Sequence, residues 1–109
     1  MAIIATLLTI AVPRYFRTLE RSRAAVLRQD IATLRESIDR FYGDTGKYPE
    51  TLAMLVDRHY LRAIPVDPIA KSAERWIVVL SDDPEDPGVK DVHSGAEGAG
   101  EDGVPYAAW

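Results

Sequence analysis

The sequence predicts an α+β fold with a long N-terminal helix, a short second helix and a small antiparallel sheet of two or three strands. Three observations support this prediction. A heptad stripe of apolar residues runs from Val26 to Tyr42, and no glycine or proline interrupts it before Gly43. The apolar, mostly β-branched run Trp76–Leu80 is too short for a second buried helix. A Pro- and Gly-containing stretch separates this run from Val89–His93, as in a β-hairpin.

The first segment of the chain is apolar and leads into the stripe. Met1 to Val12 carry no charge, but twelve helical residues rise only about 18 Å, and crossing a bilayer takes roughly 20 apolar residues. We therefore interpret residues 1–23 as part of a hydrophobic membrane anchor and stalk, with Met1 internal to a longer helix, and residues 24–109 as a globular domain. A buried core helix is the alternative. A secretory signal would need basic residues before its apolar core.

The stripe favours one continuous helix of about 40 residues that ends at the Gly43–Gly46 turn, with Pro13 as its only expected kink. From Ile31 onward, we expect the stripe to pack on the chain's own sheet. Nearer the N-terminus no sheet remains to cover it, so we expect contacts between helices of neighbouring subunits, with Val26 as one candidate. The other positions assigned to subunit packing are Ile4, Leu7, Leu8, Ala11, Pro13, Tyr15, Phe16 and Leu19.

The second half of the chain contains the shorter elements. Thr51 is placed to cap a short helix over Leu52–Val56. Pro65-Val66-Asp67-Pro68 predicts a connecting loop, because proline stands on both sides of its centre. We expect the strands at 76–80 and 89–93 to pair antiparallel. Trp76 is expected in the core, and Trp109 is expected to dock the tail.

Composition excludes several kinds of chemistry. The chain has no cysteine, so it can form neither a disulfide nor a cysteine-zinc site, and it has no thiolate nucleophile. His59 and His93 stand outside any metal-binding or catalytic motif that we recognise. No set of nucleophile, base and oxyanion donor can be assembled. We therefore expect no catalytic residues and no enzymatic activity.

Charge is distributed unevenly along the chain. Seven arginines and four acids fall within residues 14–40, whereas residues 82–109 hold eight acids and one lysine. The interleaved acids dilute the positive field of the helix, so nucleic acid is not an expected partner. The acidic tail is either a solvated loop or a site for a divalent cation. Its oxygen ligands would come from Asp91, Ser94, Glu97, Glu101 and Asp102.

Four segments, in their order along the chain, resemble the type IV pilin superfamily, and most closely the major pseudopilin of type II secretion systems. Residues 1–14 look like the second half of the family's hydrophobic helix, including its proline. Residues 38–49 are similar to the helix end and its D-x-G-x-Y-P turn, and residues 60–68 to the hydrophobe-Pro-x-Asp-Pro segment. Residues 91–98, with a terminal Trp109, look like the last strand and glycine-acidic loop.

This resemblance implies a pilin-like fold and a structural role in a periplasmic pseudopilus, built by packing of N-terminal helices. It implies a single pass through the bacterial inner membrane with the C-terminal domain in the periplasm. The implied partners are further copies of the chain, other pseudopilins, an inner-membrane assembly platform and, for a full-length form, prepilin peptidase. The basic leader and G-F-T-L-x-E motif on which that peptidase acts do not occur in this sequence.

The resemblance also implies a calcium loop, and the positions that match it are Ser94, Glu97, Glu101 and Asp102. Where the family has Gly-Ala-Asp-Gly, this chain has Gly-Ala-Glu-Gly at residues 95–98. Two alternative functions remain open. One is a minor type IV pilin that serves motility, adhesion or DNA uptake. The other is a membrane-anchored calcium-binding adaptor that does not polymerise.

Overall fold

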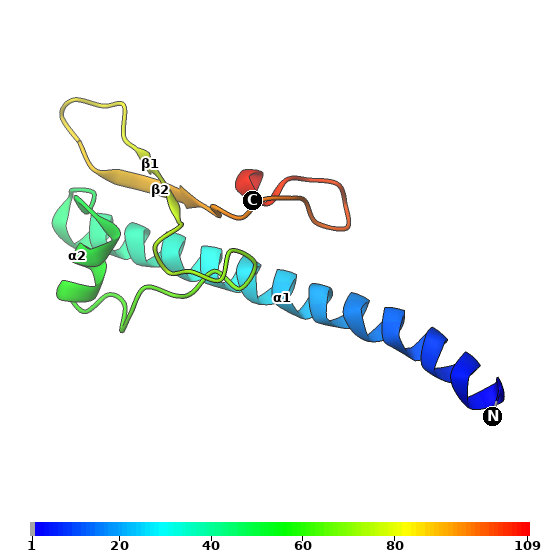
Figure 1. Cartoon of the computed structure of the whole chain (residues 1–109). Helices are drawn as coiled ribbons and strands as arrows, with labels where there is room; N and C mark the ends of the chain where they lie inside the picture. Colours follow the sequence, from blue (N-terminus) through cyan, green and yellow to red (C-terminus); the bar gives the residue numbers. More distant parts are fainter. Residues whose placement is uncertain (1) are drawn as a thin grey trace.

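The computed structural model describes the backbone of residues 2–109 and the side chains of residues 18–109. The α+β prediction is confirmed, with one long helix, one short helix and a two-stranded antiparallel sheet (Figure 1). In chain order the elements are α1 (Ala2–Thr45), α2 (Leu52–Asp57), β1 (Ile77–Leu80), β2 (Val89–His93) and the 3₁₀ helix η1 (Tyr106–Ala108). The helix α2 and the sheet lie beside the C-terminal half of α1 (Figure 1).

The helix α1 is 44 residues long and continues through Pro13. It also continues through Gly43 and ends at Thr45, within the predicted Gly43–Gly46 turn. Glycine in a helix costs only about 1 kcal/mol relative to alanine, which neighbouring turns can offset. The terminator is Gly46, whose φ of 73° places it in the left-handed region. Its N–H donates to the Tyr42 carbonyl at 2.8 Å.

A stretch of helix must be both long and apolar to span a bilayer. Within the part of the chain that the structure describes, no helix meets both conditions.

The core lies between one face of α1 and the inner face of β2. The predicted stripe supplies the helix side, since Leu27, Ile31, Leu34, Ile38 and Phe41 are each at most 5% exposed. Packing on the chain's own residues from Ile31 onward is thereby confirmed. It begins one turn earlier than expected, at Leu27, because the tail residues Tyr106 and Trp109 also pack against this core.

The sheet is a hairpin whose inner strand covers the helix. Val89 and Val92 of β2 are almost fully buried, while most of β1 is exposed. A register shift between Val79 and Leu80 allows two residues of β2 three positions apart to face the core. After β2 the chain runs close to the residues before β1. The approach at Gly95 is so close that a Cβ there would lie 1.7 Å from the Arg75 carbonyl oxygen. Only glycine fits there.

The short helix α2 begins as predicted. The Thr51 hydroxyl accepts a hydrogen bond from the Met54 N–H at 3.2 Å and thus caps the helix. Leu52 and Leu55 are buried in the core. Trp76 is also buried, as expected, and its indole N–H donates to the Pro65 carbonyl at 2.8 Å.

Candidate functional site: the stalk of α1 and the tail that crosses it

The positions predicted to pack between subunits all lie on α1, but most lie outside the described side chains. Of that set, only the side chain of Leu19 is described, and it is half-buried. Val26, the further candidate, is 50% exposed, although its neighbour Leu27 is fully buried. Within the described side chains, Leu27 is the first residue of the stripe that is buried in the core of the globular part.

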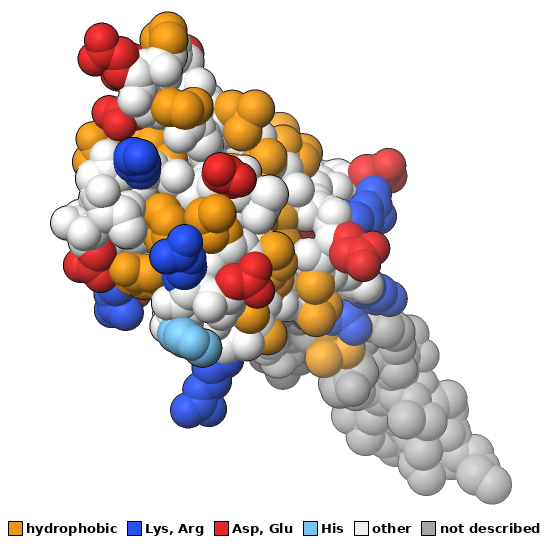
Figure 2. Space-filling view, turned by 90° about the vertical axis from the view of Figure 1, so that its left-hand side faces the viewer, with side chains coloured by type: hydrophobic (Ala, Val, Ile, Leu, Met, Phe, Trp, Pro, Cys, Tyr) orange, Lys and Arg blue, Asp and Glu red, His pale blue; other side chains and the backbone are white. Residues whose placement is uncertain are grey.

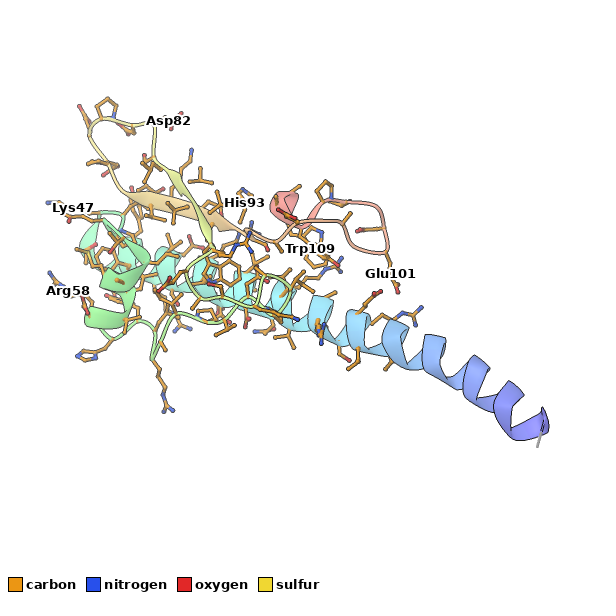
Figure 3. All side chains as sticks on the ribbon, viewed as in Figure 1. Lys47, Arg58, Asp82, His93, Glu101 and Trp109 are labelled. Atoms are coloured by element: carbon orange, nitrogen blue, oxygen red, sulfur yellow. The ribbon has the colours of Figure 1, made fainter. Side chains whose placement is uncertain are left out.

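The acidic tail folds back over α1 just above this point. Glu101 accepts a hydrogen bond from Arg21 Nε at 3.0 Å, and Asp102 lies 3.7 Å from Arg28 Nη2. The Arg28 guanidinium also lies over the Trp109 ring, 4.4 Å from its centroid. Figure 3 shows Glu101 and Trp109 on the tail, on the side that faces α1. The excess positive charge of the helix and the excess negative charge of the tail therefore partly neutralise each other through these ion pairs.

Arg35 forms a clamp between α1, β2 and the end of the chain. Its Nε donates to Asp91 Oδ1 at 2.8 Å, and its Nη2 donates to the carbonyls of Val92 at 3.2 Å and Trp109 at 2.6 Å. These three hydrogen bonds depend on the planar guanidinium group, whose N–H donors have fixed directions that the ammonium group of lysine lacks. Nothing in the periodicity of the helix distinguished Arg35 from the other arginines, so sequence reasoning missed it.

The Arg35 clamp affects the pKa of the Asp91 carboxyl. Partial burial acts to raise the pKa of the Asp91 carboxyl, but the Val92 N–H and the Arg35 guanidinium outweigh it, so that the pKa lies below its usual value. Asp91 Oδ2 also lies 3.9 Å from His93 Nε2. The carboxylate is therefore held ionised and fixed in place at the junction of helix and sheet.

A second, fully buried polar contact joins the proline loop to the end of β2. The Ser94 hydroxyl donates to Asp67 Oδ2, and both residues are 0% exposed. The other oxygen of Asp67 accepts the N–H groups of Ile69 and Ala70 at 2.9 Å each. Burial, and then the charge of Asp67, raises the pKa of the neighbouring Asp30. The sequence indicated a loop at Asp67 but gave no sign of its buried partner.

The four predicted calcium ligands occupy different environments in this structure. Ser94 is buried against Asp67, whereas Glu97 is exposed. Glu101 and Asp102 are exposed and paired with Arg21 and Arg28. Among the described residues, no group of three or more acids or histidines is arranged to hold a metal ion. Calcium at this loop stays a prediction, and binding would require the two acids to exchange arginine for the cation.

A cavity of about 770 Å³ lies between the tail and α1. Ala24 and Ala25 form part of its floor, and the ring of Tyr106 and the Arg21–Glu101 pair are among the groups around it. Arg28 and Asp102, the second ion pair between helix and tail, also line this space. On the helix side, the cavity extends from Glu20 to Arg28.

Comparisons with known protein families, with curated proteins and with solved structures found no match to this chain. Its function must therefore be argued from its residues and their geometry.

Proposed function

We propose that this chain is a structural subunit of a periplasmic pseudopilus in type II protein secretion, of the pilin-like kind that the sequence resembles. The observation that carries the proposal is the single helix α1, which runs from Ala2 to Thr45, while among the side chains that the structure describes (residues 18–109) the buried core on this helix begins at Leu27. A helix that extends this far beyond its own core can bury its remaining apolar positions against another molecule.

Packing of such helices in a head-to-tail manner supports a filament. A contact between different positions on two copies does not close on itself, so each added copy leaves a free surface for the next. The described part of α1 before Leu27 suits this role, since apolar Leu19 and Val26 alternate with charged groups such as Glu20 and Arg23. In this proposal the work of the subunit is mechanical, and no side chain performs chemistry.

The proposed location follows from the same arrangement. The apolar residues before Pro13 would lie in the inner membrane, as part of a single pass, and residues 24–109 would lie in the periplasm. The partners would be further copies of the chain, other pseudopilins and the assembly platform, with prepilin peptidase processing a full-length form. A minor type IV pilin would share this architecture. The neighbouring genes would distinguish these two functions, because secretion operons and pilus operons contain different sets of genes.

Disulfide crosslinking tests the filament, because the chain has no cysteine of its own. Leu19→Cys would be combined in turn with Ile4→Cys, Leu7→Cys, Leu8→Cys or Ala11→Cys and oxidised in membranes of the native cells. We expect at least one combination to form a ladder of multimers, while each single variant forms at most a dimer, because head-to-tail contacts join different positions.

The matched control combines Lys47→Cys with Glu50→Cys, two exposed positions just beyond the C-terminal end of α1. This pair should give no ladder. Monomers from every stalk combination would contradict the filament proposal and favour an adaptor that does not polymerise.

A further inference from the structure

The outer strand of the hairpin is apolar and exposed. Ile77 is 50% exposed, Val78 40% and Leu80 62%, although all four residues of β1 are hydrophobic. The strand pairs with β2 along one edge, and in Figure 1 the turn of the hairpin projects away from α1. Hydrophobic side chains are also visible at the hairpin end of the molecule in Figure 2, next to acidic ones.

The second edge of β1 has the properties of a pairing edge. Within residues 2–109, the backbone hydrogen bonds outside the regular helices and strands involve none of Ile77–Leu80. Proteins usually protect such an edge with lysine, proline or a covering segment, because its free N–H and C=O groups can recruit another strand. The strand β1 contains neither lysine nor proline. Its one irregularity lies in the pairing with β2.

The charges that flank β1 indicate which strand fits. Arg75 precedes the strand and Asp83 follows it, and among the described residues neither takes part in an ion pair. Asp82 lies between the strand and Asp83, but it already has an ion-pair partner, because its carboxylate lies 3.5 Å from Lys90 Nζ. A strand with an acid at the end that meets Arg75, and a base at the end that meets Asp83, would complement this edge. A second copy of β1, run antiparallel, has that pattern.

We propose that β1 pairs antiparallel with β1 of a second copy of this chain, across a two-fold axis at Val79. A two-fold axis normal to the sheet pairs each residue with the one equally far on the other side of the centre. Val78 then lies opposite Leu80 of the second copy, and Arg75 lies opposite Asp83. The two hairpins form one four-stranded sheet, in which Val78 and Leu80 each gain an apolar neighbour.

This contact goes beyond the proposed packing of helices. It is isologous and closes as a dimer, whereas helix packing in a filament is head-to-tail and open. It also involves the globular part of the molecule and none of the stalk positions. The dimer therefore joins two subunits before they enter a filament, or two filaments side by side, and each of the two contacts can fail without the other.

A single cysteine at the two-fold centre tests the pairing. In an antiparallel pair the Cα atoms of opposed residues lie about 4.5–5.5 Å apart, within the range of about 4.4–6.8 Å that a disulfide spans. Val79→Cys in the full chain, purified in detergent and oxidised, should therefore give a covalent dimer. In the matched control Ile77→Cys, the two cysteines would lie about 14 Å apart along the strands and should stay unlinked.

Charge reversal then tests the register. In the Val79→Cys background, Arg75→Glu alone and Asp83→Lys alone should each lower the yield of dimer about fivefold, because two like-charge pairs face each other across the axis. The combination of both reversals should restore the yield. A melting curve for each variant would show that the fold is kept.

Three outcomes would overturn the proposal. The first is that Val79→Cys gives no dimer. The second is that Ile77→Cys gives as much dimer as Val79→Cys, as random collision would. The third is that the two charge reversals do not compensate each other, as expected if the edge pairs with a foreign strand. Crosslinks within the stalk are scored separately in Leu19→Cys pairs, so failure here leaves the filament proposal standing, and the reverse also holds.

Discussion

At the scale of single residues, one arginine holds three parts of the molecule together. Arg35 binds the Asp91 carboxylate and the carbonyls of Val92 and Trp109. Hydrogen bonds to a charged group are stronger than those between neutral groups, and this one group contacts both the sheet and the end of the chain. Loss of its fixed geometry would therefore release the tail from the helix. By contrast, Arg21 and Arg28 form exposed ion pairs with the tail, which water screens.

The lowered pKa of Asp91 predicts a dependence of stability on pH. A carboxyl whose pKa in the folded state lies below the unfolded value of about 3.9 stabilises the fold above that pH, and its contribution is lost as the pH falls through the folded pKa. Asp91→Asn should therefore lower the free energy of unfolding at pH 7 by about 1 kcal/mol or less, the range of partly exposed pairs. Denaturant unfolding measured from pH 7 down to about pH 3 should show the two proteins converging in acid.

Asp82→Asn is the matched control for this experiment. The pKa of Asp82 is also lowered, first by a backbone hydrogen bond and then by Lys90, but its side chain is 94% exposed. We expect little change at any pH, because water screens an exposed pair. A constant difference between Asp91→Asn and the parent across this pH range would show that the Asp91 charge does not stabilise the fold.

At the scale of elements, two glycines illustrate how differently the same residue can be used. Gly95 lies where the chain leaving β2 meets the residues before β1, and a Cβ there would collide with the Arg75 carbonyl. Gly43 lies within α1, and a Cβ there would have no neighbour within 4 Å. The hairpin therefore depends on the first glycine, whereas the helix merely tolerates the second.

This contrast predicts opposite effects of one substitution. Gly95→Ala should destabilise the protein by about 1–3 kcal/mol, because backbone atoms must shift to relieve the overlap. Gly43→Ala should stabilise it by about 0.5–1 kcal/mol, because alanine loses less backbone freedom in a helix. Chemical denaturation of both variants checks the pair. A neutral Gly95→Ala would show that the hairpin does not need this close approach.

At the scale of the whole molecule, the protein is a rod with a small head on its C-terminal half. It measures 69 × 26 × 19 Å along its principal axes. The head is made of short elements that could not fold alone, since a two-stranded hairpin is at best marginally stable in water. They are stable here because the long helix supplies one wall of the core. The tail completes that core and brings its acids to the helix.

Calcium binding is a property of this whole arrangement, and it can be tested on the complete chain. If the tail binds Ca²⁺ in the folded state alone, the ion should raise the melting temperature relative to chelator, by an amount that grows with its concentration. Glu101→Gln combined with Asp102→Asn should remove the effect. Mg²⁺ at equal concentration should have a smaller one, because it gives up its water reluctantly. An unchanged melting temperature with Ca²⁺ would contradict the predicted loop.

Much of the fold was predictable because its signals are local. The alternation of four- and three-residue steps predicted the helix and its buried face, Thr51 marked the start of α2, and β2 was predicted with its observed bounds. The helix α1 ends at Thr45, within the predicted Gly43–Gly46 turn. The sequence did not decide which of the two glycines ends it, because a glycine permits a helix to end without requiring it. The helix η1 had no signal that we recognised in the sequence.

The candidate site was predictable only in part. The stripe located the point where the stalk leaves the head, but nothing local distinguished Arg35 from the other arginines of the helix. The tail acids were predicted to be ligands of a cation, which stays a prediction, whereas their arginine partners were not predicted. Ser94 was predicted to face a cation, and in the fold its hydroxyl donates to Asp67.

The sequence by itself determined a long amphipathic helix, a capped second helix and a hairpin, because hydrophobic period and turn residues act over a few positions of the chain. Only the tertiary structure decided that Arg35 meets Asp91, 56 residues away, and the Trp109 carbonyl, 74 residues away. It also decided that β1 is left exposed outside β2. Such pairings depend on how the packed elements place distant residues side by side, which no local pattern encodes.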